Sequence, residues 1–333
     1  MPAEHYGMRW RKIAEESGSF LQAGFRRTQQ TEADSMTRHH SSKAGIRPNN
    51  SFSKALAAAT LVSLAATAPY AAQAADLDAI KSKGTIRIAV ANEIPYGYMD
   101  ISGEAKGAGP DVAKHIVKEL GIANIEWIPT SFSSLIPGLQ ANRFDMVAAE
   151  MAILPQRCQQ VHFSNPNSSY GEGLLVAKGN PDDVHRYEDF ADSDKKVAIM
   201  AGADQLEMFQ ALGVPADRMV TIANNADAIS TVSTGRASAY AATSLTVSEL
   251  AGKSDRVEAA ENFSDPVVDG EPVRSWGGFT FSKDSESLRD AVNEQLAEFK
   301  KTDAWKEILT QYGFSAADLE GSFTKTAEDL CSG

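Results

Sequence analysis

Cysteine is scarce in this sequence, since Cys158 and Cys331 are the two cysteines among 333 residues. They lie far apart in the chain and lack the paired local ligands from which zinc-binding folds are built. The sequence therefore predicts no metal site. The role of the two cysteines depends on the compartment in which the chain folds.

Sequence motifs of the common enzyme classes are missing as well. The chain has no P-loop, no G-x-G-x-x-G after a strand, no H-E-x-x-H and no G-x-S-x-G. Its histidines are few, and none has a serine or cysteine nucleophile at a recognisable spacing. We therefore predict no catalytic residue and no cofactor.

Positive charge is in deficit, with a formal net charge of -12 at pH 7. Residues 1–75 hold nine Lys/Arg and five Asp/Glu, which leaves 23 basic and 39 acidic residues in the remainder. Such acidity argues against nucleic acid or an anionic membrane surface as a partner. At this length, and with 43% hydrophobic residues, the chain suits two globular lobes that each have a core.

Long apolar runs are missing apart from one stretch near the N-terminus. Residues 52–74 contain ALAAATLVSLAATA, which is too short to span a bilayer. Arg47 and Lys54 supply a positive flank, and Ala72-Gln73-Ala74 matches an A-x-A cleavage site. These features predict a cleaved export signal over residues 36–74, and the alternative is a buried alanine-rich helix.

The start of the exported chain follows from this signal. A translation start at Met36 would place the signal at the usual distance from the N-terminus. Residues 1–35 are therefore interpreted as an extension upstream of the true start of translation. We expect the mature protein to begin near Ala75 and to be periplasmic. An oxidising compartment permits disulfides, so a long-range disulfide between Cys158 and Cys331 is favoured over two free thiols.

Strand and helix patterns alternate along the rest of the chain. Such alternation predicts an α/β fold with a mainly parallel sheet in each lobe. Strands are expected at residues 85–91, 125–128, 146–149, 197–200, 220–222, 238–242 and 276–282. Helices are expected at residues 77–83, 110–120, 205–212, 225–234, 288–299 and 305–312.

The chain is expected to pass between the lobes twice. The first crossover begins within residues 165–173, and the second is the return strand at residues 276–282. This organisation predicts a first lobe of residues 75–169 and 276–333 and a second lobe of residues 170–275.

Arg157 is a lone arginine in a short turn just before the first crossover. Its planar guanidinium can bind a carboxylate through two parallel hydrogen bonds. Glu93, Tyr96 and Phe132 lie on loops that follow strands or start helices of the same lobe, where ligands bind in open α/β sheets. Together these residues predict a site for a small zwitterion with a delocalised positive charge.

The second lobe supplies further candidates for this site. Ala203 and Asp204 open a predicted helix, and free backbone N–H groups at a helix start can hold an anion. Thr243 follows a predicted strand, and Trp276 begins the return strand, where it is a further aromatic candidate.

Several motifs carry a family resemblance that covers about residues 76–333. They are K-G-T-I-R-I-A-V, G-x-G-P-D-V at residues 107–112, L-I-P-G-L-Q-A-N-R-F-D at residues 135–145, and P-Q-R-C followed by F-S-N-P. In these motifs the chain resembles the extracellular solute-binding proteins of family 3, the amino-acid-type receptors of ABC importers. The resemblance implies a periplasmic-binding-protein-like type II fold, in which two α/β lobes joined by two hinge strands close on a ligand.

A closer similarity rests on N-E-x-P-Y at residues 92–96, the cysteine after Arg157, Y-G-F-S-A at residues 312–316 and the final L-C. In these motifs the chain is similar to the ectoine and hydroxyectoine receptors of the family. The similarity implies that Glu93 binds the ligand's amidinium and that Arg157 binds its carboxylate. Tyr96 and Phe132 would flank the ligand.

Two positions depart from the family patterns. Thr243 stands where amino-acid receptors usually have an aspartate that binds the α-ammonium, which favours a ligand without a free α-amine. Ala152 stands where ectoine receptors have an aromatic residue, so one wall of the aromatic cage is missing.

The resemblance implies a monomeric binding protein that hands a small-molecule ligand to a permease in the inner membrane. The expected ligand is ectoine or hydroxyectoine, and the alternative is another amino acid or a cyclic amino-acid derivative. The rival class is a periplasmic lyase of the cyclohexadienyl-dehydratase type on the same fold. Glu93 and Asp204 are the acid/base candidates for that lyase.

Overall fold

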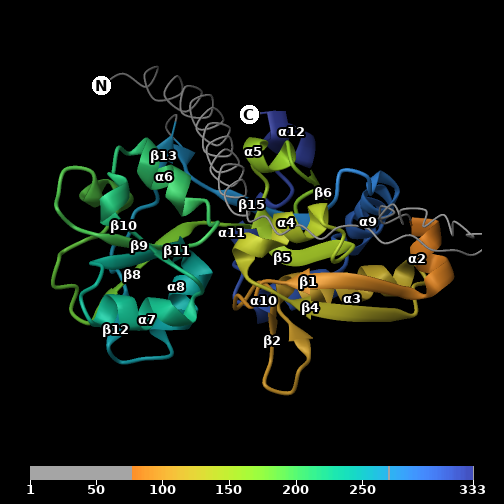
Figure 1. Ribbon diagram of the computed structural model, residues 1–333, viewed down its shortest axis with the longest axis horizontal. Coiled ribbons are helices and arrows are strands. Elements are labelled where there is room, and N and C mark those ends of the chain that lie inside the picture. The colour runs from red at the N-terminus through yellow and green to blue at the C-terminus, as the bar shows by residue number, and fades with distance from the viewer. Residues whose placement is uncertain (1–76, 269–270, 333) are drawn as a thin grey trace, which may run out of the picture. The chain divides into compact units, whose positions relative to one another are not determined.

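The computed structural model describes residues 77–268 and 271–332, which form two lobes, each built on its own sheet. The first lobe contains a six-stranded sheet and the second a five-stranded sheet. In Figure 1 the second lobe is green to cyan, whereas the first is orange to yellow-green and blue, because the chain returns to it. The predicted export signal and the predicted start at Ala75 lie outside the described residues.

The first sheet has the strand order β4-β1-β5-β15-β6, and β7 also pairs with β15. β1 is parallel to β4 and β5, whereas β15 is antiparallel to β5, β6 and β7. The strands are β1 (Thr85–Val90), β4 (Asn124–Pro129), β5 (Met146–Ala152), β6 (His162–Phe163), β7 (Ser168–Tyr170) and β15 (Ser275–Phe281).

Side chains of the first sheet alternate between two hydrophobic cores, because successive residues of a strand point to opposite faces. Ile86 and Ile88 of β1 belong to a core with residues of α3, α9 and α10, whereas Ala89 and Val147 belong to a core with residues of α4. The lobe's helices are α2 (Leu77–Lys83), α3 (Ala108–Glu119), η1 (Phe132–Ser134), α4 (Leu135–Gln140), α5 (Pro155–Cys158), α9 (Glu286–Phe299), α10 (Asp303–Gln311), α11 (Ala316–Gly321) and α12 (Ala327–Ser332).

The second sheet has the strand order β10-β9-β11-β8-β12 around one hydrophobic core. Its strands are β8 (Glu172–Ala177), β9 (Val197–Met200), β10 (Met219–Ile222), β11 (Ala239–Thr243) and β12 (Val257–Ala259). Its helices are η2 (Tyr187–Phe190), α6 (Gln205–Ala211), η3 (Ala216–Arg218), α7 (Ala226–Ser233) and α8 (Ser244–Ala251). Two small hairpins complete the described chain, β2 (Tyr98–Met99) with β3 (Ala105–Lys106) and β13 (Val267–Val268) with β14 (Glu271–Pro272).

Both sheets are mixed, so the expectation of mainly parallel sheets was wrong. β8 is antiparallel to β11 and β12, and β15 is antiparallel to its three partners. The physical reason is that β8 follows the first crossover directly, and β15 brings the chain back into the first sheet. Neither strand is preceded by the crossover helix that a parallel neighbour requires.

The two crossover segments pair with each other as strands. Ser275 lies opposite Tyr170, and Gly277 lies opposite Ser168, in an antiparallel register. Gly277 is required there because a Cβ at this position would come within 2.8 Å of the backbone oxygen of Glu150 and of Ser168 Oγ. The tight fit of the second crossover against β5 therefore depends on a residue without a side chain.

Two local expectations need correction. Arg157 is in the single-turn helix α5 instead of a turn, because Pro155 sits at the helix start, where a missing N–H costs nothing. Helix α8 was not predicted, although Thr243 caps it by accepting a hydrogen bond from the backbone N–H of Thr246. In the described residues, no helix combines the length and apolar character that crossing a membrane requires.

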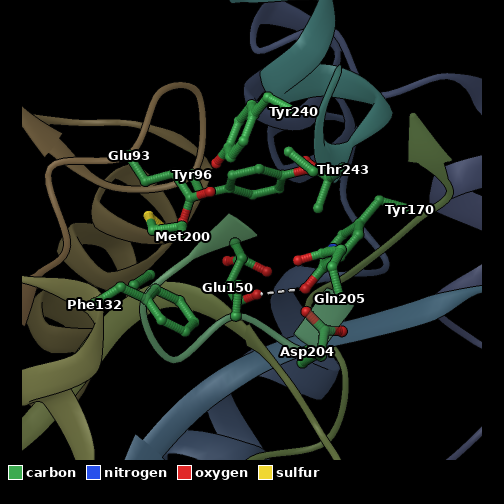
Figure 2. A pocket seen from close by; sticks show the side chains of 14 residues that line it. Glu93, Tyr96, Phe132, Glu150, Tyr170, Met200, Asp204, Gln205, Tyr240 and Thr243 are labelled. Carbon is green, nitrogen blue, oxygen red and sulfur yellow. Dashed lines mark hydrogen bonds between the residues drawn. The ribbon is translucent and has the colours of Figure 1, made fainter. Parts of the chain in front are cut away.

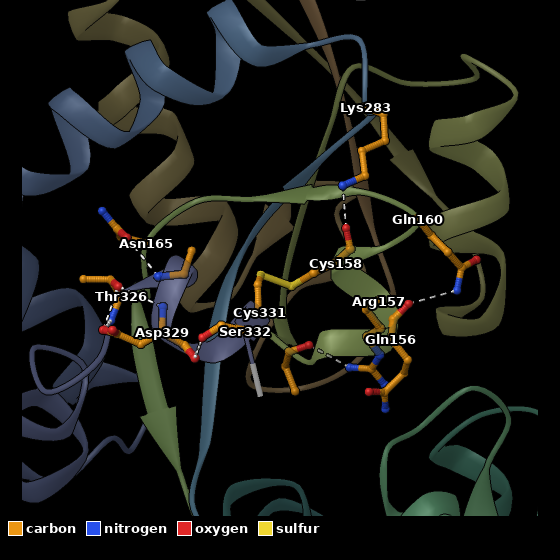
Figure 3. Close-up of a disulfide and its surroundings, with 12 residues drawn as sticks. Gln156, Arg157, Cys158, Gln160, Asn165, Lys283, Thr326, Asp329, Cys331 and Ser332 are labelled. Carbon is orange, nitrogen blue, oxygen red and sulfur yellow. Dashed lines mark hydrogen bonds between the residues drawn. A yellow bond between two sulfur atoms is a disulfide. The ribbon is translucent and has the colours of Figure 1, made fainter. Parts of the chain in front are cut away.

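A disulfide joins Cys158 of α5 to Cys331 of α12, across 173 residues of sequence (Figure 3). Helix α12 packs on α5, and the backbone N–H of Ala327 donates to Asn165 Oδ1 at 3.1 Å. Lys283 Nζ donates to the backbone oxygen of Cys158. The last helix thus holds the short helix that carries Arg157.

Candidate ligand-binding site

A cavity lies between the two sheets, and its walls come from both lobes (Figure 2). The space between its walls is about 380 Å³ when the open mouth is counted. The first lobe contributes Glu93, Tyr96, Phe132, Ala149, Glu150 and Ala152, and Tyr170 comes from the first crossover. The second lobe contributes Met200, Ala203, Asp204, Gln205, Tyr240, Ala242 and Thr243.

Six of the eight residues predicted to bind ligand are part of this lining. They are Glu93, Tyr96, Phe132, Ala203, Asp204 and Thr243. They meet because each follows a strand of its sheet or starts a helix after it, and such ends converge at the mouth of open α/β sheets. In Figure 2 Glu93, Tyr96 and Thr243 lie on one side of the cavity, and Phe132, Glu150 and Asp204 lie on the other.

The loop after β1 places Glu93 and Tyr96. Glu93 and Gly97 exchange backbone hydrogen bonds of 3.0 and 2.8 Å, which close a tight turn. Tyr96 Oη donates to Thr243 Oγ1 at 2.7 Å, and its ring contacts Tyr170 with the centroids 5.2 Å apart. The tyrosine therefore links the two lobes directly across the cavity.

Glu93 is a buried carboxyl with neutral partners from the second lobe. Its Oε1 accepts from Asn225 Nδ2 at 3.3 Å and from Thr246 Oγ1 at 3.4 Å. Burial raises the pKa of Glu93 to about 7; the bond from Asn225 opposes this rise, and the negative charge of Asp204 adds to it. A positively charged group beside Glu93 would restore its ionised form.

Arg157 lies beside the cavity but is not one of its lining residues in the described chain. Its guanidinium donates to the backbone oxygen of Ala152 and, across the lobes, to that of Gly202, both at 3.0 Å. The same group sits 5.7 Å from the ring centroid of Phe132, and only 7% of the residue is exposed. Arg157 thus places a positive charge against the ring of Phe132, which itself lines the cavity.

Trp276 is placed away from the cavity. Its indole N–H donates to the backbone oxygen of Gly321 at 2.9 Å, which directs the ring toward α11. The structure thus does not bring Trp276 together with the other predicted residues.

Five larger lining residues were not predicted from the sequence, namely Glu150, Tyr170, Met200, Gln205 and Tyr240. Two of them carry a signal that could have been used. Glu150 is the one charged residue in the otherwise apolar run from Met146 to Ile153, and Tyr240 is the one large residue in A-S-A-Y-A-A. A charged side chain within a buried strand indicates that it lines a site, because a buried strand otherwise excludes charge. A single large side chain among small ones can be interpreted in the same way.

The cavity is acidic. Three carboxyl side chains line it, those of Glu93, Glu150 and Asp204, whereas no lysine, arginine or histidine does so among the described residues. Burial also raises the pKa of Glu172, behind Gln205, to about 8. Such walls can bind a positively charged group and hold it against aromatic faces.

These carboxyl groups predict how stability depends on pH. A carboxyl whose folded pKa lies above its unfolded value stabilises the fold below the unfolded pKa, and this contribution is lost as pH rises through the folded pKa. Glu93 loses this contribution between about pH 4.5 and about pH 7. Glu172 loses it between about pH 4.5 and about pH 8. Burial lowers the pKa of Lys300 to about 8. Lys300 therefore stays mostly charged over most of this pH window, and its contribution to stability changes little.

We therefore expect the ligand-free protein to melt at a lower temperature at pH 8 than at pH 6. Glu93 accounts for about 1 kcal/mol of this loss, because only about one unit of its window lies above pH 6. Thermal unfolding followed by circular dichroism at both pH values tests this. Glu93→Gln should reduce the difference, with the contribution of Glu172 remaining, and exposed Glu119→Gln should leave it unchanged. Equal melting temperatures at both pH values would contradict the prediction.

Comparison with known proteins agrees with the two-lobe architecture. Residues 86–315 match the family model of the bacterial extracellular solute-binding proteins, family 3. The chain belongs to this family. One relative is a probable amino-acid ABC transporter periplasmic-binding protein, y4tE, of Sinorhizobium fredii, 57% identical over 263 residues, which are 78% of this chain and 87% of the relative.

Two solved structures are similar to the solute-binding protein in fold. The crystal structure of EhuB in complex with hydroxyectoine is 32% identical, has a TM-score of 0.70 and covers 77% of this chain and 97% of its own. The ancestral amino-acid-binding protein AncCDT-1, a precursor of cyclohexadienyl dehydratase, is 30% identical, has a TM-score of 0.62 and covers 72% of this chain and 99% of its own. These likenesses show the periplasmic-binding-protein type II fold.

Family membership settles the class of activity. The protein is a solute-binding protein of an amino-acid-type ABC importer and not an enzyme. A small-molecule ligand and a membrane permease are therefore its partners, and its relatives are periplasmic. The lyase alternative is set aside on this ground.

Proposed function

We propose that this receptor captures ectoine or hydroxyectoine for import. The observation that carries the proposal is a buried carboxyl, Glu93, in one cavity with the aromatic rings of Tyr96 and Phe132. Both ligands carry a carboxylate on a ring with a delocalised amidinium. The amidinium suits Glu93 and the aromatic faces, each of which contributes roughly 0.5–2 kcal/mol depending on desolvation.

Arg157 is proposed to bind the ligand's carboxylate. An arginine has five N–H donors, and the structure uses two of them on the backbone oxygens of Ala152 and Gly202. Three N–H donors remain, and a carboxylate that enters beside Phe132 would accept hydrogen bonds from them. Backbone N–H groups at Ala203 and Asp204 are the proposed partners from the second lobe. Trp276 has no proposed contact.

A basic amino acid such as arginine is the second candidate, because Glu150 and Asp204 add two carboxyl groups to that of Glu93 in the lining. Thr243 at the end of β11 weakens the case for ligands with a free α-ammonium, since it offers a hydroxyl and no charge. Other candidates are betaines, proline analogues and opines.

The setting of the receptor is proposed as follows. The export signal of residues 36–74 is removed near Ala75, and the mature protein acts as a periplasmic monomer. Its lobes are residues 75–169 with 276–333, and residues 170–275. Ligand favours the closed arrangement because it contacts both lobes at once.

Calorimetric titration of the purified mature protein tests the ligand. The panel is ectoine, hydroxyectoine, arginine, proline, glycine betaine and an opine. We expect ectoine or hydroxyectoine to bind most tightly. A plain α-amino acid that binds at least tenfold more tightly, about 1.4 kcal/mol, would reject this choice.

Ectoine affinity should depend on pH through Glu93. Its pKa of about 7 means that binding a cation must first ionise it at lower pH, so affinity should fall roughly tenfold per pH unit below 7. Titration at pH 5.5, 6.5 and 8 measures this slope. Glu93→Gln should bind about tenfold more weakly at pH 8 and should lose most of the slope. A slope that persists in full in that variant would assign it to another group.

A further inference from the structure

Glu150 occupies a costly position in the cavity wall. It lies inside β5 with a backbone φ of 48°, in the left-handed region that residues with a Cβ rarely adopt. Its side chain is a carboxyl, yet only 3% of the residue is exposed. Either feature alone disfavours glutamate at this position, so its presence indicates a compensating role.

The first crossover holds this carboxyl in place. Asn167 Nδ2 donates to Glu150 Oε1 at 2.6 Å, and Ser168 Oγ donates to Oε2 at 2.5 Å. Tyr170 Oη donates to the backbone oxygen of Glu150 at 2.8 Å, the bond drawn in Figure 2. Asn167 Oδ1 in turn accepts from the indole N–H of Trp305 at 2.9 Å. A hydrogen-bonded chain thus runs from the cavity through the crossover to the core.

The charge of Glu150 has no direct counter-ion in the described residues. The two side chains that donate to its carboxylate, Asn167 and Ser168, are neutral. The nearby Lys300 Nζ donates instead to the backbone oxygens of Pro166 and Ser322. A carboxylate has about four lone-pair sites, and these bonds use two of them. Since Glu150 also lines the cavity, the remaining sites are available to a ligand.

We propose that Glu150 is a specificity-determining residue that selects ligands with a delocalised N–H cation, an amidinium or a guanidinium. The inference rests on the proposed receptor function and deepens it, because it adds a second carboxylate contact to that of Glu93. The crossover fixes the direction of the carboxylate. A ligand that binds it therefore also changes the hydrogen bonds of Asn167 and Trp305.

The test compares ligands that differ in charge but hardly in shape. Arginine and citrulline are such a pair, since a guanidinium in one is a neutral ureido group in the other. Ectoine, arginine and citrulline are titrated calorimetrically into the wild-type protein, Glu150→Gln and, as a matched control, exposed Glu119→Gln. Thermal melting of each variant identifies any loss of folding. NMR of the tryptophan indole N–H groups follows Trp305, with Trp127 and Trp276 as internal references.

We expect the wild-type protein to prefer arginine to citrulline at least tenfold, and Glu150→Gln to reduce that preference to less than threefold. Ectoine should bind Glu150→Gln at least tenfold more weakly, and Glu119→Gln should behave like the wild type. Ligand should shift the indole signal of Trp305 in the wild type and not in Glu150→Gln.

The outcomes separate the two proposals. Tight ectoine binding that is unchanged in a folded Glu150→Gln protein would overturn the inference and leave the proposed ligand in place. An arginine preference that depends on Glu150, without ectoine binding, would overturn the proposed ligand and support the inference. If neither ectoine nor arginine binds the wild type, both proposals fail. If Glu150→Gln does not fold, an arginine preference below threefold in the wild type, or a Trp305 signal that ligand leaves unmoved, would overturn the inference.

Discussion

Replacing Cys158 and Cys331 together by serine is expected to lower the free energy of unfolding by up to about 5 kcal/mol. The disulfide closes a loop of 173 residues, and in the chain-entropy model so long a loop restricts the unfolded chain strongly. In the folded protein the bond ties α12 to α5, whose contact is otherwise small and partly exposed. The loss should therefore appear as a large change in global stability.

Urea unfolding of the mature protein with and without reductant measures this effect. Reductant should shift the midpoint of the wild type close to that of the double variant and should not affect the double variant itself. A stability loss below about 1 kcal/mol would contradict the prediction, as would two free thiols titrated in the unreduced, unfolded protein.

Arg157→Ala is expected to weaken binding of ectoine, or of whichever carboxylate ligand binds the wild type, by about 100-fold or more, which is about 3 kcal/mol. Two causes add. The ligand's carboxylate would be buried without a charged partner, and the hydrogen bond from Arg157 to the backbone oxygen of Gly202, which joins the lobes, would be lost. Phe132→Ala should cost about tenfold, because it removes an aromatic face but no charge.

Calorimetry on both variants, with exposed Arg143→Ala as the matched control, tests this order. Arg143→Ala should bind like the wild type. If Arg157→Ala retains wild-type affinity, the guanidinium has only a structural role toward Ala152 and Gly202. A larger loss in Phe132→Ala than in Arg157→Ala would mean that aromatic contact outweighs charge in this cavity.

Much of the secondary structure could be predicted because local signals agree with the fold. Thr85–Val90 combines β-branched residues with burial, and Leu77–Lys83 ends at Gly84, whose φ is 69°. Strand direction could not be predicted in the same way. A buried strand such as β8 has the same apolar composition whether its neighbours run parallel or antiparallel, and direction depends on how the chain enters the sheet.

The candidate site was predictable where it depends on the ends of strands. Glu93, Tyr96 and Phe132 follow strands of one sheet, so their proximity follows from topology. Glu150 and Tyr240 lie inside strands, and which face they point to depends on a register that sequence does not specify. The side chain of Arg157 is long and flexible, so its direction toward Gly202 needed the structure.

Strand β15 has a consequence for the order in which the chain can fold. It lies between β5 and β6, although it follows them by more than a hundred residues, so the first sheet stays divided until residue 281 is available. The second sheet needs only residues 172–259, which are continuous. A chain whose C-terminal part is not yet available can complete its second lobe first, while the first lobe keeps an unpaired strand edge at β5.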